Sequence, residues 1–299
     1  MKLTSLLPLF AILFVFSSEA QETETKKLPE NLIEISPNIY MLKGKGGNIG
    51  LSIGDDGVFM IDDQYANGIA EVQETIKNIT EKEVQFLINT HHHGDHTGGN
   101  VAMAESGATI FAHDNVRKRL ENMIAMSTEK GETTSEKVLP VVTFSEDITF
   151  HYNENRIFVF HIHNAHTDGD AAVYFTDSNV LHTGDVFFNG RYPYIDLKSG
   201  GSVAGYIEAL DRMLQVTNAD TKVIPGHGDP GTTADMRFTK EMLKDLLQQV
   251  KIVHEAGSTE DEILKMKEIT AKYDALDYGS GFINTEKMLQ TVYAEVSKN

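Results

Sequence analysis

The sequence of 299 residues contains no cysteine. Disulfide bonds, thiolate metal ligands, a lipid-modified N-terminal cysteine and a cysteine nucleophile are therefore excluded. No linker rich in proline, glycine and serine divides the chain, and its length can bury one large hydrophobic core. We therefore expect one domain over residues 21–299, with a helical extension at its C-terminal end.

Basic residues are scarce: 26 lysines and arginines stand against 44 aspartates and glutamates, which gives a formal net charge of −18. Such an acidic excess keeps the surface well solvated and disfavours contact with the phosphate backbone of a nucleic acid. We therefore expect a small-molecule substrate as the partner and no nucleic acid.

The apolar run Leu6–Phe16 is shorter than the roughly 20 residues that a membrane-spanning helix needs. Lys2 precedes this run and Ser18-Glu19-Ala20 follows it, which is the arrangement of a secretory signal peptide. We expect residues 1–20 to be removed after Ala20. The mature chain is then periplasmic or secreted, without stable insertion in a membrane.

The run His91-His92-His93-Gly94-Asp95-His96 holds four potential metal ligands within six residues. It follows residues 84–90, an apolar segment rich in strand-forming residues. In an extended chain, residues i and i+2 point to the same side, so His91 and His93 can converge on one cation while His92 points away. The acid and the last histidine of the run can face a second cation. An exposed polar run is a poorer interpretation, because it gives no reason to interleave acid and imidazole in this order.

Three later strand ends carry further candidate ligands. His166 lies in a loop between two predicted strands, Asp185 follows the strand that begins at Val180, and His227 follows Val223-Ile224. Each of these alone is weak evidence. Together with the first run they make four strand ends that deliver His or Asp beside glycine, which indicates one shared metal site.

Four other histidines have a structural interpretation. His161 and His163 alternate with apolar residues, as in a half-buried strand. His113 has no ligand neighbour in the sequence. We expect these three and His182 to be dispensable as ligands.

The chain alternates between predicted strands and predicted helices. Strands are expected at residues 33–35, 39–42, 48–53, 57–62, 84–90, 108–112, 141–144, 148–150, 157–162, 171–175, 179–185 and 223–224. Helices are expected at residues 66–79, 115–126, 203–216 and 234–256, with a helical, polar tail at 261–299. This order fits an α/β sandwich of two sheets with helices outside.

The H-x-H-x-D-H motif at residues 91–96, followed in order by His166, Asp185 and His227, resembles the metallo-β-lactamase superfamily over roughly residues 33–242. The resemblance implies a four-layer αββα sandwich, two mixed β-sheets flanked by helices, with the site at one edge between the sheets. It also implies a ligand set: His91, His93 and His166 on one metal, Asp95, His96 and His227 on the second, and Asp185 bridging the two.

Asp185 departs from the clinically familiar β-lactamases, which carry Cys or a non-ligating Ser at this position. An aspartate there is similar to thioesterases of the hydroxyacylglutathione hydrolase type and to lactonases. Export to a periplasm, where β-lactams act, favours a β-lactam. We therefore expect a β-lactam amide or another cyclic or acyl ester-type substrate. The alternative is a thioesterase or lactonase without physiological β-lactamase activity.

Seven ligands for two cations leave coordination positions open, as in catalytic zinc sites. Imidazole and carboxylate suit two Zn²⁺ ions, with Fe or Mn as alternatives. A hydroxide held by zinc is the expected nucleophile, because zinc lowers the pKa of bound water to about 7. By the resemblance, Asp95 also passes a proton to the leaving group. A di-iron redox module is disfavoured, because such superfamily members carry glutamate where this chain has His93.

Residues 186–201 begin at the expected bridging ligand and should form one wall of the substrate pocket. Arg191, Tyr192 and Tyr194 are the candidate substrate-binding residues. Arg191 is expected to bind an anionic group, because a guanidinium holds a carboxylate in a planar, two-bonded geometry. Phe187 fits the hydrophobic core equally well.

Overall fold

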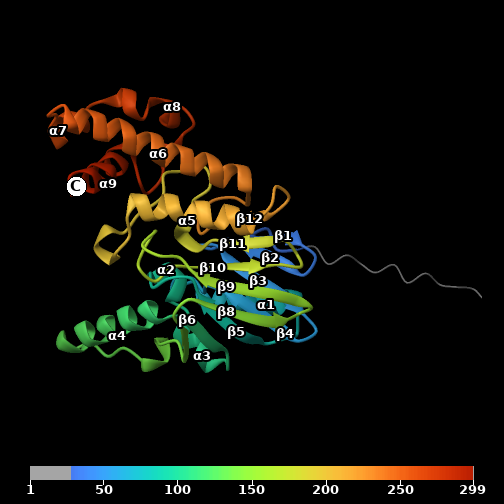
Figure 1. Ribbon diagram of the computed structural model, residues 1–299. Helices are drawn as coiled ribbons and strands as arrows, with labels where there is room; N and C mark the ends of the chain where they lie inside the picture. Colours follow the sequence, from blue (N-terminus) through green and yellow to red (C-terminus); the bar gives the residue numbers. More distant parts are fainter. Residues whose placement is uncertain (1–27, 299) are drawn as a thin grey trace, which may run out of the picture.

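The structure is a computed structural model that describes residues 28–298 (Figure 1). The expected signal peptide, residues 1–20, lies outside the described part of the chain. Within that part, none of the helices combines the length and the apolar character that crossing a membrane requires.

The first sheet has the strand order β1 to β7, as in the sequence. Its strands are β1 (Leu32–Ser36), β2 (Ile39–Leu42), β3 (Ile49–Gly54), β4 (Gly57–Ile61), β5 (Val84–Asn89), β6 (Thr109–His113) and β7 (Val142–Phe144). The strands β1 to β4 pair antiparallel, whereas β4 to β7 pair parallel. The carboxyl ends of β4, β5 and β6 therefore lie at one edge of the sheet, where the first ligand run begins.

The second sheet has the order β13-β12-β11-β10-β9-β8. Its strands are β8 (Asp147–Tyr152), β9 (Asn155–His161), β10 (Ala171–Phe175), β11 (Val180–His182), β12 (Lys222–Ile224) and β13 (Gly231–Thr232). Only β11 and β12 pair parallel, with His182 opposite Ile224. Because both strands run the same way, the residues after them emerge side by side.

The two sheets pack face to face, and the strand sequences account for it. In β4 every residue is buried, as expected for a strand covered on both faces. Phe59 and Ile61 belong to the core between the sheets, whereas Val58 and Met60 point to the opposite face. The core between the sheets also takes Val159 from the second sheet.

Helices cover the outer face of each sheet. The helices are α1 (Ile69–Ile79), α2 (Gly94–Thr97), α3 (Asn100–Glu105), α4 (Asp114–Glu129), α5 (Val203–Val216), α6 (Thr233–Glu255), α7 (Glu260–Ile263), α8 (Ala271–Asp274) and α9 (Thr285–Val296). Apolar residues of α1 and α3 pack on the first sheet, and those of α5, α6 and α9 pack on the second. Figure 1 shows α5 to α9, in yellow to red, gathered on one side of the molecule, with α3 and α4 on the other. The expected four-layer sandwich of two mixed sheets is confirmed.

Several expected element boundaries differ from the structure. The helix expected from residue 66 begins at Ile69, because the preceding residues form a turn in which the Gly68 N–H donates to the Tyr65 carbonyl (2.8 Å). The expected helical tail consists of α7, α8 and α9, separated by short 3₁₀ turns. Strand β9 ends at His161, so His163 lies beyond it, and its side chain is 59% exposed.

Candidate metal centre

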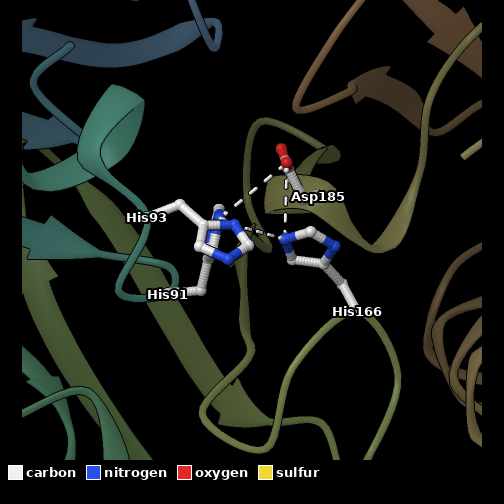
Figure 2. Close-up of side chains that lie close together, drawn as sticks. All are labelled: His91, His93, His166 and Asp185. Atoms are coloured by element: carbon white, nitrogen blue, oxygen red, sulfur yellow. Dashed lines mark hydrogen bonds and ion pairs between the residues drawn. The ribbon is translucent and has the colours of Figure 1, made fainter. Parts of the chain in front are cut away.

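The seven expected ligands come together at the edge between the two sheets. His91 follows β5 after one residue, and His93 caps the short helix α2, which carries Asp95 and His96. His166 lies in the loop between β9 and β10. His182 and Ile224 lie opposite each other on β11 and β12. Asp185 follows His182 by three residues, and His227 follows Ile224 by three residues. Figure 2 shows His91 and His93, from one loop, converging with His166 and Asp185 from other segments.

The first group consists of three imidazoles and one carboxylate. Nδ1 of His93 lies 3.1 Å from Nε2 of His91 and 2.9 Å from Nε2 of His166. Oδ2 of Asp185 lies 3.8 Å from the His91 nitrogen and 3.6 Å from the His166 nitrogen. Zinc–ligand bonds of about 2 Å in tetrahedral geometry put neighbouring ligand atoms roughly 3.3 Å apart, so these separations suit a shared cation.

The second group consists of Asp95, His96 and His227. Oδ2 of Asp95 lies 3.4 Å from Nε2 of His227 and 3.6 Å from Nε2 of His96. Asp185 reaches this group as well, because its Oδ1 is 3.2 Å from Nε2 of His96 and its Oδ2 is 3.4 Å from Nε2 of His227. Among residues 28–298, Asp185 is therefore the carboxylate in contact distance of both groups, which is the geometry expected of a bridging ligand.

Hydrogen bonds on the far side of each ring fix the tautomers of the first group. Nδ1 of His166 donates to the backbone carbonyl of Tyr194 (2.8 Å), which can only accept. Nε2 of His93 donates in the same way to the carboxylate of Asp196 (3.1 Å). Thr90 donates its hydroxyl proton elsewhere and therefore accepts from Nδ1 of His91 (3.1 Å). Three bare nitrogen lone pairs then face one another, an arrangement that a cation stabilises and that neutral imidazoles alone do not.

Burial keeps the first group neutral. It lowers the pKa of His91 well below its usual value, and the positive charge of His96 adds to the effect. Burial also lowers the pKa of His166, to about 4, although the Asp185 carboxylate works in the opposite direction. Neutral imidazoles are the form that binds metal ions, so no proton competes for these two ligands near neutral pH.

In the second group the carboxylates dominate the electrostatics. Burial lowers the pKa of His227, but the charge of Asp185 and hydrogen bonds to Asp185 and Asp95 outweigh it and raise the pKa to about 9. Burial raises the pKa of Asp185, yet the neighbouring His96 and His227 bring it well below its usual range. The group therefore holds ionised carboxylates that attract positive charge.

Two further observations fit a metal pair. Nε2 of His96 and Oδ1 of Asp185 are buried and make no hydrogen bond, so each has an unused coordination position. Such atoms are rare in folded proteins unless an ion or water satisfies them. Imidazole and carboxylate donors without thiolate suit Zn²⁺, with Fe and Mn possible for the same donor set.

Carboxylates that the sequence did not point to hold the ligands in place. Oδ2 of Asp62 accepts from Nδ1 of His96 (2.7 Å). Asp170 is buried and accepts from the backbone N–H of His166 (2.7 Å), from that of Thr167 (2.8 Å) and from the Thr167 hydroxyl (2.5 Å). Burial raises the pKa of Asp170 to about 8, against the effect of these hydrogen bonds. An acid as the last residue of a predicted strand was the only sequence signal for Asp62.

A cavity of about 760 Å³ opens over the metal centre. Its floor includes His93, Asp95, Asp185 and His227, whereas His91, His96 and His166 lie beneath it and are fully buried. Its walls comprise Lys43, Gly44, Lys45, Gly46, Asn48, Tyr65, Gly94, Phe188, Arg191, Tyr192, Tyr194, Gly228, Asp229, Phe282 and Ile283. A substrate in this cavity meets the ligands of both groups.

The residues expected in the pocket wall have different surroundings. Arg191 is exposed and lines the cavity. Tyr194 lines it too, with its ring stacked on that of His93 (centroids 5.8 Å apart, 25° between planes). Tyr192 also borders the cavity but is only 1% exposed, and its hydroxyl donates to Asp274 (3.0 Å). Phe187 is fully buried in the core.

Neither metal group includes His113, His161, His163 or His182. The rings of His113 and His161 stack on each other with centroids 3.7 Å apart. His92 belongs to neither group but lies near His93 and Asp196. Burial, with the charge of His93 adding to it, lowers the pKa of His92 to about 3.

Comparison with known proteins agrees with this geometry. A family model for the metallo-beta-lactamase superfamily matches residues 42–227. The hydroxyacylglutathione hydrolase of Pelagibacter ubique (strain HTCC1062) is 28% identical over 123 residues, which are 40% of this chain and 44% of that protein. The metallo-beta-lactamase type 2 of Bacteroides fragilis is 23% identical over 168 residues, 56% of this chain and 62% of the relative. The chain thus spans less than two thirds of either relative.

Solved structures share the fold. The metallo-beta-lactamase from Pontibacter korlensis matches with a TM-score of 0.59 and 20% identity, covering 72% of this chain and 98% of the other. An inverting sec-alkylsulfatase from Pseudomonas sp. matches with a TM-score of 0.67 and 17% identity, covering 88% and 49%. Because the family model spans more than half of the sequence, this chain belongs to the metallo-beta-lactamase superfamily.

Proposed function

We propose that this chain is a hydrolase with two zinc ions that cleaves a carbonyl substrate of the ester, thioester, lactone or β-lactam class. One observation carries the proposal: Asp185 lies within 3.2–3.8 Å of ligand nitrogens in both groups, beneath an open cavity. A carboxylate between two ligand groups is the arrangement of a binuclear site with room for a substrate.

The zinc pair, when bound, supplies a Lewis acid for the substrate carbonyl and lowers the pKa of water to about 7. His91, His93 and His166 hold the first ion, and His96, His227 and Asp95 the second. Of these, His93, Asp95 and His227 face the cavity, so substrate approaches from their side.

Asp95 is the candidate for proton transfer. Burial raises the pKa of Asp95. A hydrogen bond to His227 and the charge of His96 together lower it by more, so the pKa lies below its ordinary value. The carboxylate is therefore ionised at neutral pH and lines the cavity. It can accept a proton from the attacking water and pass it to the leaving group.

The named relatives support more than one leaving group. One is a hydroxyacylglutathione hydrolase and another a metallo-beta-lactamase type 2. The aspartate at position 185 favours a thioester or lactone, and the predicted export favours a β-lactam. Each activity is a distinct outcome of one experiment.

The test is a parallel assay of the mature protein with nitrocefin, a lactone and a thioester. We expect turnover of at least one of them, abolished by a chelator and restored by Zn²⁺. The variant Asp95→Asn should lose most of the turnover and hold the second ion less tightly, because the amide neither accepts the proton nor binds a cation as a carboxylate does. Turnover that persists after complete removal of metal would contradict the proposal.

Export to the periplasm or the medium is part of the same proposal. It is supported by the order of Lys2, the apolar run Leu6–Phe16 and Ala20. Cell fractionation and N-terminal sequencing of the native protein should find a chain that begins at Gln21. A cytosolic chain that retains Leu6–Phe16 would refute it.

A further inference from the structure

Part of the cavity wall comes from outside the region that the family model matches. That match ends at residue 227, yet Phe282 and Ile283 line the cavity from the segment between α8 and α9. The helical C-terminal segment is therefore not only a cover for the second sheet. It brings an apolar surface to the mouth of the active-site cavity.

Phe282 is unusually open for a phenylalanine, with 74% of its surface exposed. Its ring meets Tyr194 edge to face, with centroids 5.8 Å apart and 89° between planes. Lys287 holds it from another side, since Nζ lies 4.5 Å from the ring centroid and donates to the Phe282 carbonyl (3.1 Å). The ring is thus positioned by its neighbours while most of its surface stays available for contact.

Tyr194 connects this ring to the metal centre. The Tyr194 ring stacks on His93, and its carbonyl accepts from His166. Phe282 therefore lies one aromatic ring away from the first metal group. A substrate held at the metals extends past Tyr194 before it reaches Phe282.

A cation lies beside Phe282. A Cβ atom placed on Gly281 would be 3.9 Å from Cβ of Arg191, so the arginine stem passes close to the residue that precedes Phe282. Among the described residues, no carboxylate lies within ion-pair distance of Arg191. The other two cations of the cavity, Lys43 and Lys45, are paired with Asp229 and Glu71. The cavity mouth thus offers one open ring beside a cation that makes no ion pair, although its charge contributes to lowering the pKa of Asp229.

We infer that the C-terminal segment selects the substrate: Phe282 packs on an apolar, ring-bearing acyl group, and Arg191 binds an anionic group next to it. This inference rests on the proposed function. Burial of a phenyl group against an exposed ring removes apolar surface of both from water and adds an aromatic contact. A compound with a small acyl group lacks the contact with Phe282, and a neutral compound lacks the contact with Arg191.

The experiment compares two thioesters with the same leaving group and the same carboxylate: S-phenylacetyl and S-acetyl thioglycolate. Released thiol is followed with a disulfide reagent, which the protein itself does not consume because it has no cysteine. For Phe282→Ala we expect kcat/KM to fall about tenfold with the phenylacetyl compound, equivalent to about 1.4 kcal/mol. With the acetyl compound kcat/KM should stay within about twofold, and metal content should not change.

The matched control is Ile252→Ala, which removes a similarly exposed apolar side chain on α6 away from the cavity. It should leave both substrates unaffected. Equal losses with both thioesters in Phe282→Ala, or no loss with the phenylacetyl compound, would overturn the inference.

A binding measurement separates this inference from the proposed function. N-phenylacetylglycine and N-acetylglycine carry the same carboxylate, and their affinities for the zinc-loaded protein can be measured by calorimetry without turnover. The wild type should bind the phenylacetyl compound about tenfold more tightly, and Phe282→Ala should lose this preference. If the wild type binds both compounds equally tightly, the inference is wrong even if the protein hydrolyses thioesters. A preference that depends on Phe282 supports the inference even if neither thioester is cleaved.

Discussion

The Asp62 carboxylate accepts a hydrogen bond of 2.7 Å from Nδ1 of His96, a residue 34 positions later in the sequence. The same carboxylate accepts from the backbone N–H (2.7 Å) and the hydroxyl (2.8 Å) of Thr90. It therefore joins the end of β4 to the end of β5, directly before the ligand run. Asp62 adopts a left-handed conformation (φ 61°), which aspartate and asparagine tolerate better than other side chains.

Replacing Asp62 with asparagine should weaken metal binding. The amide keeps the backbone conformation but removes the charge that orients His96, and loss of such a partner lowers metal affinity about 10- to 100-fold. Competition with a chromophoric chelator measures the affinity. The control is Asp63→Asn, an equally buried neighbour that accepts from the Gly99 N–H and contacts no ligand ring. Equal affinities for the two variants would show that Asp62 has no orienting role.

Removal of His227 should empty one metal position. His227 contacts Asp95 and Asp185 but not the three histidines of the first group, so His227→Ala should lower the metal content from near two to near one per chain. Elemental analysis of dialysed protein gives the number. His163→Ala changes an exposed histidine outside both groups and should retain both ions. A wild type with a single ion, unchanged in His227→Ala, would rule out the binuclear centre.

Arg191→Ala should raise KM for a carboxylate-bearing substrate about tenfold, because loss of one charged contact is worth about 1.4 kcal/mol at this exposure. The rate constant kcat and the metal content should change little, since binding used equally in ground and transition states appears in KM. Steady-state kinetics with a neutral ester serves as the internal comparison. Arg237→Ala, an exposed arginine on α6 away from the cavity, is the matched control. Similar losses on charged and neutral substrates would assign Arg191 a structural role.

The stacked pair His113 and His161 should make stability depend on pH. Burial lowers the pKa of His161 to about 4, against its hydrogen bond to the Asp170 carbonyl, whereas an unfolded histidine titrates near 6.5. Between these values the unfolded state binds a proton that the folded state does not. The contribution of neutral His161 to the free energy of unfolding is therefore complete above about pH 6.5 and is lost as the pH falls toward 4.

The variant His161→Asn keeps a donor for the Asp170 carbonyl and removes the titration. Its Tm should decline less than that of the wild type between pH 7 and pH 5, as measured by thermal unfolding in buffers of equal ionic strength. His151→Gln, at an exposed position on β8, should follow the wild type. Parallel declines of the wild type and His161→Asn would contradict the assignment.

The candidate metal ligands could be proposed from the sequence because they lie in the segments that follow strand ends. Apolar runs predict strands by their period, and parallel neighbours such as β11 and β12 bring the residues after their carboxyl ends to the same edge. The positions of His91 and His93 relative to the strand end then settle which side chains converge. The layer order of the fold is predicted by the same alternation of strands and helices.

The residues that support and surround the metals depend on the tertiary structure. Asp62, Asp170 and Asp196 act through hydrogen bonds to residues that folding brings close, and no local pattern distinguishes them from surface acids. Tyr192 borders the cavity, and a hydrogen bond to Asp274, 82 residues away, holds its hydroxyl within the fold, a contact that its place after Asp185 does not predict. The sequence did not point to Phe282, because only folding brings it to the cavity and into contact with Tyr194. Short-range sequence patterns determine which face of a strand is buried, whereas contacts between distant segments depend on how the layers pack, and only the folded chain decides them.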